Sequence, residues 1–515
     1  MSQLQLRRGS TVLLAGAALL FGVAAVEGGS DYTGGQWWAP GERHVIGAAL
    51  EFSNADGRLR LVNTGEPIDT AGHPFFEPIG KNGRACVTCH QPADAMSLSA
   101  QTIRARWDAT AGKDPLFAAI DGSNCPSLPQ GEKASHSLLL TKGLFRIPRP
   151  WPPRAADGSV IKPEFDLEVV SDPTGCNLDP RYGLSSGNPT VSVFRRPRPV
   201  ANMKFMLSLP HGVTPHEYFL YNDKSLLPKD PETGAFVSVQ LMSDGRVPTL
   251  RSQATDAGLS HLEMIAQLTQ GELAKIEEFE RSIYVAQGFS SQAGNLEGPD
   301  TPPGLGPRAL RDGPPGELGN NPVNRVFGTF AMWSKPRSSS GSEPSPREAF
   351  QASVARGADV FFDKRFFIQD VGVYNDKGLG NPFKRSCASG CHNTVLTGMD
   401  LAPGFMDLGL NNWPWNRQDD LPLFKTTCHD SAVPQSYLGR VVYTHDPGRA
   451  LVTGKCRDIG ATMTQQMRGL AARAPYFMNG SAGTLRELVD FYDRRFNIRY
   501  TEQEKQDLVN FMSVL

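Results

Sequence analysis

Two short motifs, each with two cysteines followed by a histidine, are the parts of the sequence whose residue types and spacing can do chemistry. The first is "ACVTCHQ" at residues 85–91, in which Cys86 and Cys89 lie three positions apart and His90 follows directly. Cysteines at this spacing share one turn and can each form a thioether with a vinyl group of a porphyrin, while the adjacent imidazole binds the iron. A zinc site would need a second pair of ligands nearby, and a redox dithiol would not need the histidine. The motif therefore predicts a covalently bound haem c with His90 as an iron ligand.

The second motif, "RSCASGCH" at residues 385–392, has one residue more between its cysteines. Cys387 and Cys391 lie four positions apart, and His392 follows. The glycine before Cys391 can adopt the backbone conformations that a widened turn requires. On spacing alone, a haem remains one alternative, and a disulfide between the two cysteines or a pair of free thiols remains the other.

Two later segments of the chain repeat each other in the same order. "DGRVPTLR" at 244–251 resembles "NGSAGTLR" at 479–486. Each is followed by a Thr-x-x-Glu capping box that opens a predicted helix, and apolar residues then recur at helical spacing. The matching positions are Thr269 and Thr501, Glu272 and Glu504, Ile276 and Leu508, Phe279 and Phe511, and Ile283 and Leu515. Three elements in one order indicate an internal duplication. A duplicated haem domain favours a second haem, held by Cys387, Cys391 and His392 in a widened turn.

The length and composition of the chain are those of a globular protein with more than one domain. It has 515 residues, 39% hydrophobic and 20% charged, and its formal net charge of −1 gives no sign of nucleic-acid binding. We predict a mainly α fold with two haem domains. The first domain covers residues 31–287 and contains an irregular, β-containing insertion at about 126–240. A Pro/Gly/Ser-rich linker at 288–345 leads to the second domain at 346–515.

The N-terminal segment has the layout of an export signal. Arg7 and Arg8 precede an apolar run from Val12 to Val26, and small residues follow. This pattern predicts a secretory signal peptide in residues 1–30, with an uncleaved N-terminal anchor as the alternative. We therefore expect an exported, periplasmic protein that meets a membrane only if the segment stays attached.

Four of the eight cysteines lie outside the two motifs, namely Cys125, Cys176, Cys428 and Cys456. An exported protein meets an oxidising compartment in which disulfides form. Proximity along the chain suggests the pairs Cys125–Cys176 and Cys428–Cys456. Sequence alone does not fix connectivity, so this pairing is a hypothesis.

Further segments carry a resemblance to a known family. "MSDGRVPTLRSQ" with "HLEM" closely after it, and the closing "RAPYFMNGSAGTLRELVDFYDRRFNIRYTEQEKQDLVNFMSVL", resemble the bacterial di-haem cytochrome c peroxidase and MauG superfamily. The resemblance is best over the last 165 residues, moderate over 240–285 and almost absent over 95–235. It implies two cytochrome c-like domains, two covalently bound haem c groups with iron, and a calcium ion between the domains.

The same resemblance implies roles for two polar residues near the first haem. In the family's peroxidases a Trp-Asp-Gly-Arg segment is followed by a Gln ten residues after the Trp and by a Glu ten residues further on. Residues 244–246 match the segment, Gln253 and Glu263 match the two positions, and Ser243 replaces the Trp. A carboxylate at position 263 would move a proton between the oxygens of peroxide, and the amide of Gln253 would orient it. Alternatively, both are polar residues on a helix surface.

The Trp that Ser243 replaces relays electrons between the haems in relatives. Another aromatic residue, such as Trp413 or Trp415, could take that role here, although packing is the commoner role of such residues.

The second axial ligand of the C-terminal haem has two candidates. MauG-like relatives place a Tyr at the position of Tyr492, and a phenolate favours high oxidation states of iron. Met478 replaces a His of the family pattern and could bind the iron through its thioether, which favours the reduced form. Tyr492 as an ordinary core aromatic is the remaining alternative.

Four histidines outside the motifs could provide a distal ligand to the first haem: His136, His211, His216 and His261. Any one of them is more often a surface or hydrogen-bonded residue. His261 is the strongest candidate because it lies two residues before Glu263.

We therefore predict an exported di-haem c-type oxidoreductase that uses hydrogen peroxide. Its electrons would come from a small redox protein, a cytochrome c or a cupredoxin, or, in a MauG-like enzyme, from a protein substrate. The alternatives are a non-catalytic di-haem electron-transfer cytochrome, a di-haem oxygenase of an apolar substrate, as in the rubber oxygenases that the sequence also resembles, and a protein with one haem only.

Overall fold

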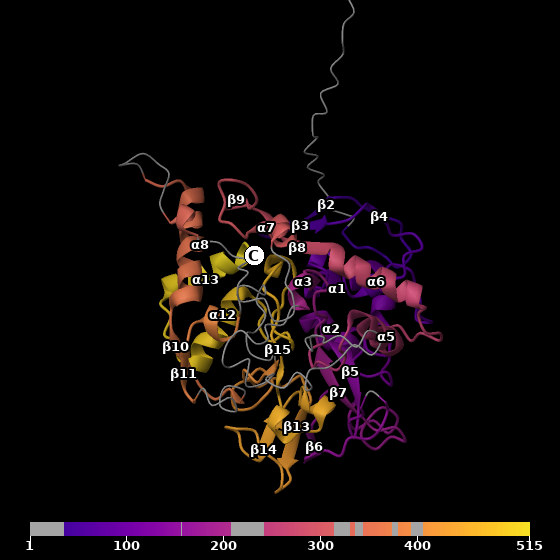
Figure 1. Cartoon of the computed structure of the whole chain (residues 1–515). Helices are drawn as coiled ribbons and strands as arrows, with labels where there is room; N and C mark the ends of the chain where they lie inside the picture. Colours follow the sequence, from indigo (N-terminus) through magenta and orange to yellow (C-terminus); the bar gives the residue numbers. More distant parts are fainter. Residues whose placement is uncertain are drawn as a thin grey trace, which may run out of the picture.

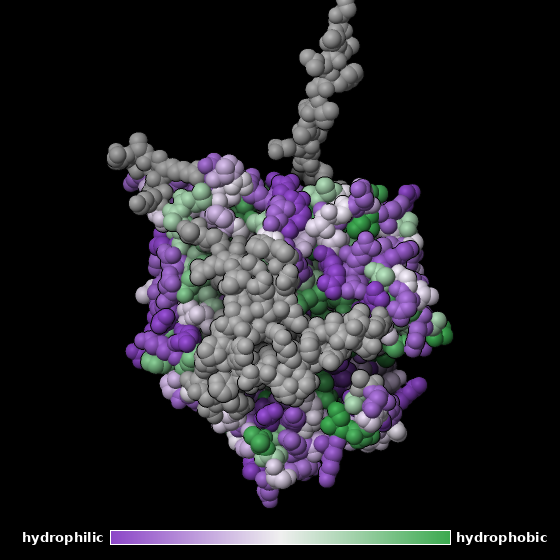
Figure 2. Space-filling view, viewed as in Figure 1, coloured by the Kyte–Doolittle hydropathy of each residue, from purple (hydrophilic) through white to green (hydrophobic). Residues whose placement is uncertain are grey.

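The structure is a computed structural model that describes residues 36–155, 157–207, 241–313, 330–334, 343–372, 380–392 and 405–515. The expected export segment at 1–30 and the candidate ligands His211 and His216 lie outside these residues. None of the described helices is long and apolar enough to cross a membrane. Outside the grey atoms, the face in Figure 2 is a mosaic of hydrophilic and hydrophobic residues, as expected for a protein surface.

Helices and short strands both occur along the described chain. The α-helices are α1 (Ala100–Thr110), α2 (Ser137–Lys142), α3 (Met203–Met206), α5 (Leu250–His261), α6 (Gln270–Ser282), α7 (Gly306–Asp312), α8 (Pro346–Asp363), α10 (Cys387–Gly390), α11 (Ala450–Thr453), α12 (Leu485–Phe496) and α13 (Glu502–Ser513). The strands are β1 (Val45–Ile46), β2 (Ala49–Asn54), β3 (Gly57–Asn63), β4 (Ile68–Asp69), β5 (Phe145–Pro150), β6 (Phe165–Ser171), β7 (Thr190–Arg195), β8 (Ile283–Ser290), β9 (Gly294–Asn295), β10 (Phe366–Ile368), β11 (Phe383–Arg385), β12 (Phe405–Met406), β13 (Leu423–Cys428), β14 (Val441–Thr444) and β15 (Thr462–Met463). The described residues thus form a mixed fold with more strand than the expected mainly α fold. The division into two cytochrome c-like domains stays a prediction.

The first half of the chain contains an antiparallel sheet in the order β2-β3-β8-β9. Leu61 of β3 is paired with Val285 of β8, so the sheet joins segments that are far apart in the sequence. Leu59, Leu61, Ile283 and Val285 are buried in one hydrophobic core with Phe279 of α6. Ile283, expected on the last turn of a helix, is instead the first residue of β8, because its extended backbone (φ −98°, ψ 127°) ends α6.

The insertion makes one strand pairing within itself and one with the second half of the chain. β5 pairs with β7 inside the insertion, and β6 pairs with β13, which also pairs with β14. In Figure 1 this three-stranded sheet lies below the two halves, which stand side by side. The disulfides Cys125–Cys176 and Cys428–Cys456 are both present, so the pairing inferred from proximity is confirmed.

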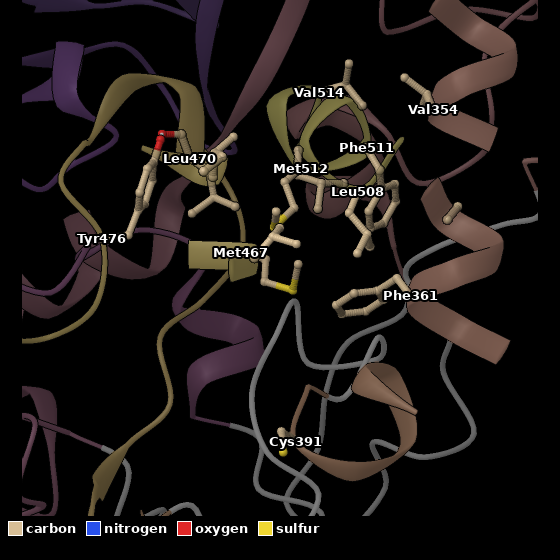
Figure 3. Close-up of a cluster of buried hydrophobic side chains, with 14 of the residues drawn as sticks. Val354, Phe361, Cys391, Met467, Leu470, Tyr476, Leu508, Phe511, Met512 and Val514 are labelled. Atoms are coloured by element: carbon tan, nitrogen blue, oxygen red, sulfur yellow. The ribbon is translucent and has the colours of Figure 1, made fainter. Parts of the chain in front are cut away.

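The second half is centred on the contact between α8 and α13 (Figure 3). Val354 and Phe361 of α8 and Phe511 of α13 belong to one buried core, and the rings of Phe361 and Phe511 are 5.5 Å apart. Gly357 lets the helices approach closely, because a Cβ there would lie 2.0 Å from the carbonyl oxygen of Asp507. The helix pair thus forms a rigid support beside the second motif.

The described part of the expected linker at 288–345 contains the end of β8, then β9 and α7. Leu296 and Leu305 are buried in the core of the second half, and Leu310 is buried against Val62 of β3. The segment up to residue 313 is therefore not the irregular linker that its glycine and proline content predicted, because its leucines are part of two hydrophobic cores.

Candidate functional site

The first motif forms one tight turn. Cys86–Thr88 is a 3-10 helix, and the backbone N–H groups of Cys89 and His90 both donate to the carbonyl of Cys86 at 3.1 Å. The backbone N–H of Ala85 donates to Thr88 Oγ1 at 3.0 Å and fixes the start of the turn. As a result Cys86, Cys89 and His90 all line the same cavity.

The imidazole of His90 is oriented by one hydrogen bond. Its Nδ1 lies 3.1 Å from the carbonyl oxygen of Met96, so Nδ1 carries the proton and donates. This leaves Nε2 with its lone pair, which is the usual arrangement of a metal-binding histidine. Desolvation lowers the pKa of His90 to about 4, so the ring is neutral at neutral pH. The same effect raises the pKa of Cys86 and of Cys89 to about 12.

One face of α5 forms part of the wall of this first cavity. Leu250, Gln253, Ala254, Ala257 and His261 follow one another at helical spacing and all line it. The sequence-predicted Gln253 and His261 are thus brought into the same cavity as His90.

His261 is held by a hydrogen bond to a buried carboxylate. Its Nδ1 lies 2.5 Å from Asp121 Oδ2, and the other oxygen of Asp121 binds the guanidinium of Arg84. Arg84 also donates to the carbonyls of Pro115 and Leu116, both at 2.7 Å. Burial alone would raise the pKa of Asp121, but Arg84 and His261 outweigh it and lower that pKa. A permanently charged carboxylate therefore fixes the ring of His261 and leaves its Nε2 for other partners.

Glu263 does not share this placement. It lies beyond the C-terminal end of α5 in a left-handed conformation (φ 53°), and its Oε1 is 3.4 Å from Lys81 Nζ. The Glu263 side chain is 29% exposed, that of Lys81 is 61% exposed, and Glu263 is not among the residues that line the first cavity. The structure brings Gln253 and His261 together with His90 but leaves Glu263 outside the cavity lining. A proton-transfer role for Glu263 stays a prediction.

Glu280 is a candidate that the sequence did not reveal. It lies on the buried face of α6, lines the first cavity and is 2% exposed. Its Oε2 has no hydrogen-bond partner among the described residues. Burial, with a smaller contribution from Glu277, raises the pKa of Glu280 to about 8, so the carboxyl group carries a proton at neutral pH. The duplication could have pointed to it, because Met512 occupies the matching position and lines the second cavity.

The second motif forms a wider turn. The N–H groups of Cys391 and His392 both donate to the carbonyl of Cys387, at 3.2 and 2.9 Å. Ser386 and Ser389 close the start of the turn by donating from each backbone N–H to the other's hydroxyl, at 3.1 and 3.3 Å. Each carbonyl bond spans one residue more than in the first motif. The predicted widened turn is confirmed, and it keeps both cysteines and the histidine on one cavity.

The wall of the second cavity contains aromatic and sulfur-containing side chains. Figure 3 shows Phe361, Met467 and Met512 between the helix pair and Cys391. The hydroxyl of Tyr500 lies 3.6 Å from Sγ of Cys387. Such a largely apolar lining is typical of a site for a flat, apolar ring system.

Both candidates for the second axial ligand line the second cavity. Tyr492 of α12 packs against Phe477 and Phe496, with ring centroids 5.6 and 6.3 Å away. Burial raises the pKa of Tyr492 far above its usual value, so it is a neutral phenol unless a cation lies against its oxygen. Met478 is 2% exposed and needs no deprotonation to bind a metal. The choice between them stays open.

The two cavities share a wall. Arg196 and Pro197 line both of them. Ser243 lines the first cavity, Met463 lines the second, and the N–H of Met463 donates to the carbonyl of Ser243 at 3.0 Å. The position at which relatives carry a Trp therefore lies at the junction of the cavities. The tryptophan-containing segment 411–416 lines neither cavity.

The residues of both cavities fit a covalently attached haem c. Each cavity is lined by the two cysteines and the histidine of one motif. Orphaned buried polar atoms, Oε2 of Glu280 and Nε of Arg196, indicate that the cavities are built for a further group. Among the described residues no cluster of three or more His, Cys, Asp or Glu could hold a metal ion, and the calcium between the domains stays a prediction.

Comparisons with known proteins agree with this class of site, proteins with covalently attached haem c. Two curated proteins are 32% identical to the chain over 146 residues: the cytochrome-c peroxidase IdrP1 of Pseudomonas sp. (strain SCT) and that of Denitromonas iodatirespirans. The match covers 26% of this chain and 37% of each relative, so the chain spans little more than a third of the length of the curated relatives it matches. This distant similarity supports, more particularly, a cytochrome c peroxidase-like family. No family model and no solved structure matches the chain.

Besides Glu280, three residues of the site were not predicted from the sequence: Arg84, Asp121 and Arg196. Arg84 directly precedes the first motif, and Arg196 belongs to the dense cluster "FRRPRP" at 194–199. A run of arginines in an otherwise apolar stretch is a signal that could have been noticed. Asp121 gives no such signal, because its partner His261 lies far along the chain.

Proposed function

We propose that the protein is an exported di-haem c-type oxidoreductase that uses hydrogen peroxide, in the manner of cytochrome c peroxidases or of MauG. The observation that carries the proposal is the pair of cavities, each lined by the cysteines and histidine of one motif and separated by Arg196 and Pro197. The names of the distant relatives support peroxide as the oxidant. Bound haem supplies the redox chemistry.

The side chains of the first cavity would handle the peroxide. His261, with Nδ1 held by Asp121, can accept a proton at Nε2 and return it, which is the role of a general acid–base. Gln253 offers an amide that can donate to one peroxide oxygen and accept from the other. Glu263 would need its contact with Lys81 to change before it could reach the same oxygens.

The second cavity would exchange electrons with an outside partner. Tyr492 or Met478 would complete the coordination of the iron bound by His392, and the choice sets whether oxidising equivalents are stored or passed on. The partner would be a small redox protein, a cytochrome c or a cupredoxin, or a protein substrate whose side chain is oxidised. The two disulfides favour an oxidising compartment such as the periplasm.

The test is the addition of stoichiometric peroxide to the purified protein, followed by optical and Mössbauer spectroscopy. We expect a rapid change to a state more oxidised than ferric. His261→Gln should slow it by about 100-fold, the usual contribution of a positioned acid–base group. Thr255→Val, on the same helix but not lining the cavity, is the matched control. Spectra that do not respond to peroxide would contradict the proposal.

A non-catalytic di-haem electron carrier is the second candidate. One observation favours it, because each cavity contains side chains that could bind an iron as a second ligand. His261 lines the first cavity, and Met478 and Tyr492 line the second. With these side chains as ligands, both irons would be six-coordinate and closed to peroxide. Electron paramagnetic resonance separates the two functions, since a carrier would show two low-spin ferric signals and no high-spin signal.

A further inference from the structure

Three arginines lie in the wall between the two cavities and, in the part of the chain that the structure describes, form no ion pair with an acidic side chain. Arg196 lines both cavities, Arg198 lines the first and Arg473 lines the second. No carboxylate of the described residues forms an ion pair with any of them. Their neighbour Arg195 differs, because it is bound by Asp446 at 2.7 Å and by Asp244 at 2.5 Å.

The three side chains are instead held by backbone carbonyls. Arg196 donates to the carbonyls of Leu98 at 2.6 Å and Arg473 at 2.8 Å. Arg198 donates to that of Thr464 at 3.1 Å, and Arg473 donates to those of Arg468 and Gln466. These bonds fix the direction of each guanidinium but do not neutralise its charge. Nε of Arg196 has no partner at all among the described residues.

The charge that results is costly for the protein alone. Burial and the repulsion of Arg473 lower the pKa of Arg196 to about 9 and that of Arg198 to about 10, and burial lowers the pKa of Arg473 to about 10. Buried charges in proteins are normally paired, since an uncompensated one is strongly destabilising. The three arginines therefore need a negatively charged group to balance them, and the two cavities are where such a group can lie.

We propose that Arg196, Arg198 and Arg473 form a shared carboxylate-binding wall that receives the propionates of both haems, with Arg196 contacting one propionate from each. The inference rests on the proposed function insofar as it requires two haems. A porphyrin attached by its vinyl edge to cysteines directs its propionate edge away from them, and each haem brings two carboxylates. Guanidinium groups are the usual partners of such carboxylates.

The wall couples the two haems electrostatically. A positive charge near an iron favours the ferrous over the more positive ferric state, so removal of an arginine should lower the reduction potential of the haem that it contacts. Arg196→Gln should affect both haems, Arg198→Gln only the first and Arg473→Gln only the second. We expect the ferric-to-ferrous ratio at a fixed potential to rise about tenfold for each affected haem, which is 59 mV for one electron.

The experiment is a spectroelectrochemical titration of the complete protein. The double variant Cys387→Ser with Cys391→Ser, which keeps only the first haem, assigns the two potentials. Arg196→Lys keeps the charge and should restore both potentials. Arg468→Gln is the matched control, because Arg468 is as buried as Arg196 but lines neither cavity. If Arg196→Gln does not fold, the other two variants provide the test. Arg198→Gln should then lower the reduction potential of the first haem only, and Arg473→Gln that of the second only.

The outcomes separate this inference from the proposed function. Unchanged potentials in all three variants, with two haems present, would overturn the carboxylate-binding wall even if peroxide reacts. The expected pattern in a protein that ignores peroxide would support the wall and contradict the peroxidase. A third outcome would also overturn the proposal. If added inorganic phosphate shifts the reduction potentials of the wild type, the three arginines bind a free anion and not the propionates.

Discussion

The turns of the two motifs bring a histidine to a cavity through different hydrogen bonds. In the first, the N–H of His90 donates to the carbonyl four residues before it, and in the second that of His392 donates to the carbonyl five residues before it. The extra residue is absorbed within the turn, and the cysteines and histidine still line one cavity in each case. The comparison shows that the number of residues between the cysteines does not by itself decide whether such a motif brings its cysteines and histidine to one cavity.

The largest effect that tests this comparison is the number of attached haems. We expect two covalently bound haems in the mature chain and one in each double variant, Cys86→Ser with Cys89→Ser and Cys387→Ser with Cys391→Ser. The reason is that each turn serves its own cavity. Intact mass spectrometry and haem staining of denatured gels measure the number. A single haem in the wild type, with Cys387 and Cys391 joined to each other, would show that the wide turn is not a haem site.

The cavities also differ at one matched position, where the first has Glu280 and the second Met512. The pKa of Glu280 is raised from 4.5 to about 8 in the folded protein, so the folded state holds a proton that the unfolded state loses above pH 4.5. The contribution of Glu280 to the free energy of unfolding is therefore fully present below about pH 4.5. It falls by up to about 1.4 kcal/mol per pH unit as the pH rises to about 8. Glu280→Met should remove this component of the pH dependence, measured as the free energy of unfolding in urea from pH 5 to 9.

The reverse exchange sharpens the same point. Met512→Glu places a carboxyl group in the second cavity, at the position that Glu280 holds in the first. We expect it to add a loss of stability with rising pH that the wild-type second half lacks, because the new carboxyl group is equally buried. A pH profile that Glu280→Met leaves unaltered would mean that the carboxyl group is hydrated or paired when haem is bound.

A smaller effect distinguishes the helices that support the two cavities. Gly357 of α8 lies against the backbone of α13, whereas Gly271 of α6 has no atom closer than 4.0 Å to an added Cβ. Gly357→Ala should lower the free energy of unfolding by about 1–3 kcal/mol through overpacking. Gly271→Ala should raise it by about 0.5–1 kcal/mol, since alanine is the better helix former. Denaturant unfolding measures both, and equal effects would contradict the close contact of α8 with α13.

Local features of the molecule were predictable because they depend on neighbouring residues. The capping boxes that begin at Thr269 and Thr501 and the wide turn at Cys387 are all present. The strand that begins at Ile283 was not predicted, because its pairing with β3 outweighs the helical pattern. The shared wall at Arg196 could not be predicted either, because it forms only when both halves of the chain meet.

The placement of Gln253 and Glu263, the two candidates for handling the peroxide, also depends on more than their spacing in the sequence. The spacing of Gln253 and Glu263 fits the family pattern, yet α5 ends at His261 and directs its last turn to the cavity. Sequence spacing gives a position along the chain, and the end of the helix decides which side chain reaches the site.

The smallest expected effect concerns Lys81, whose ammonium group lies 3.4 Å from Glu263. Such an exposed pair contributes at most about 0.5 kcal/mol, so Lys81→Ala should leave the free energy of unfolding nearly unchanged. It should also change the rate of the peroxide reaction less than twofold, since Glu263 does not line the first cavity. Stopped-flow spectroscopy measures the rate, with His261→Gln as the contrasting variant. A tenfold change in rate at constant stability would show that Lys81 controls the position of Glu263, and would make Glu263 a partner of His261 in proton transfer.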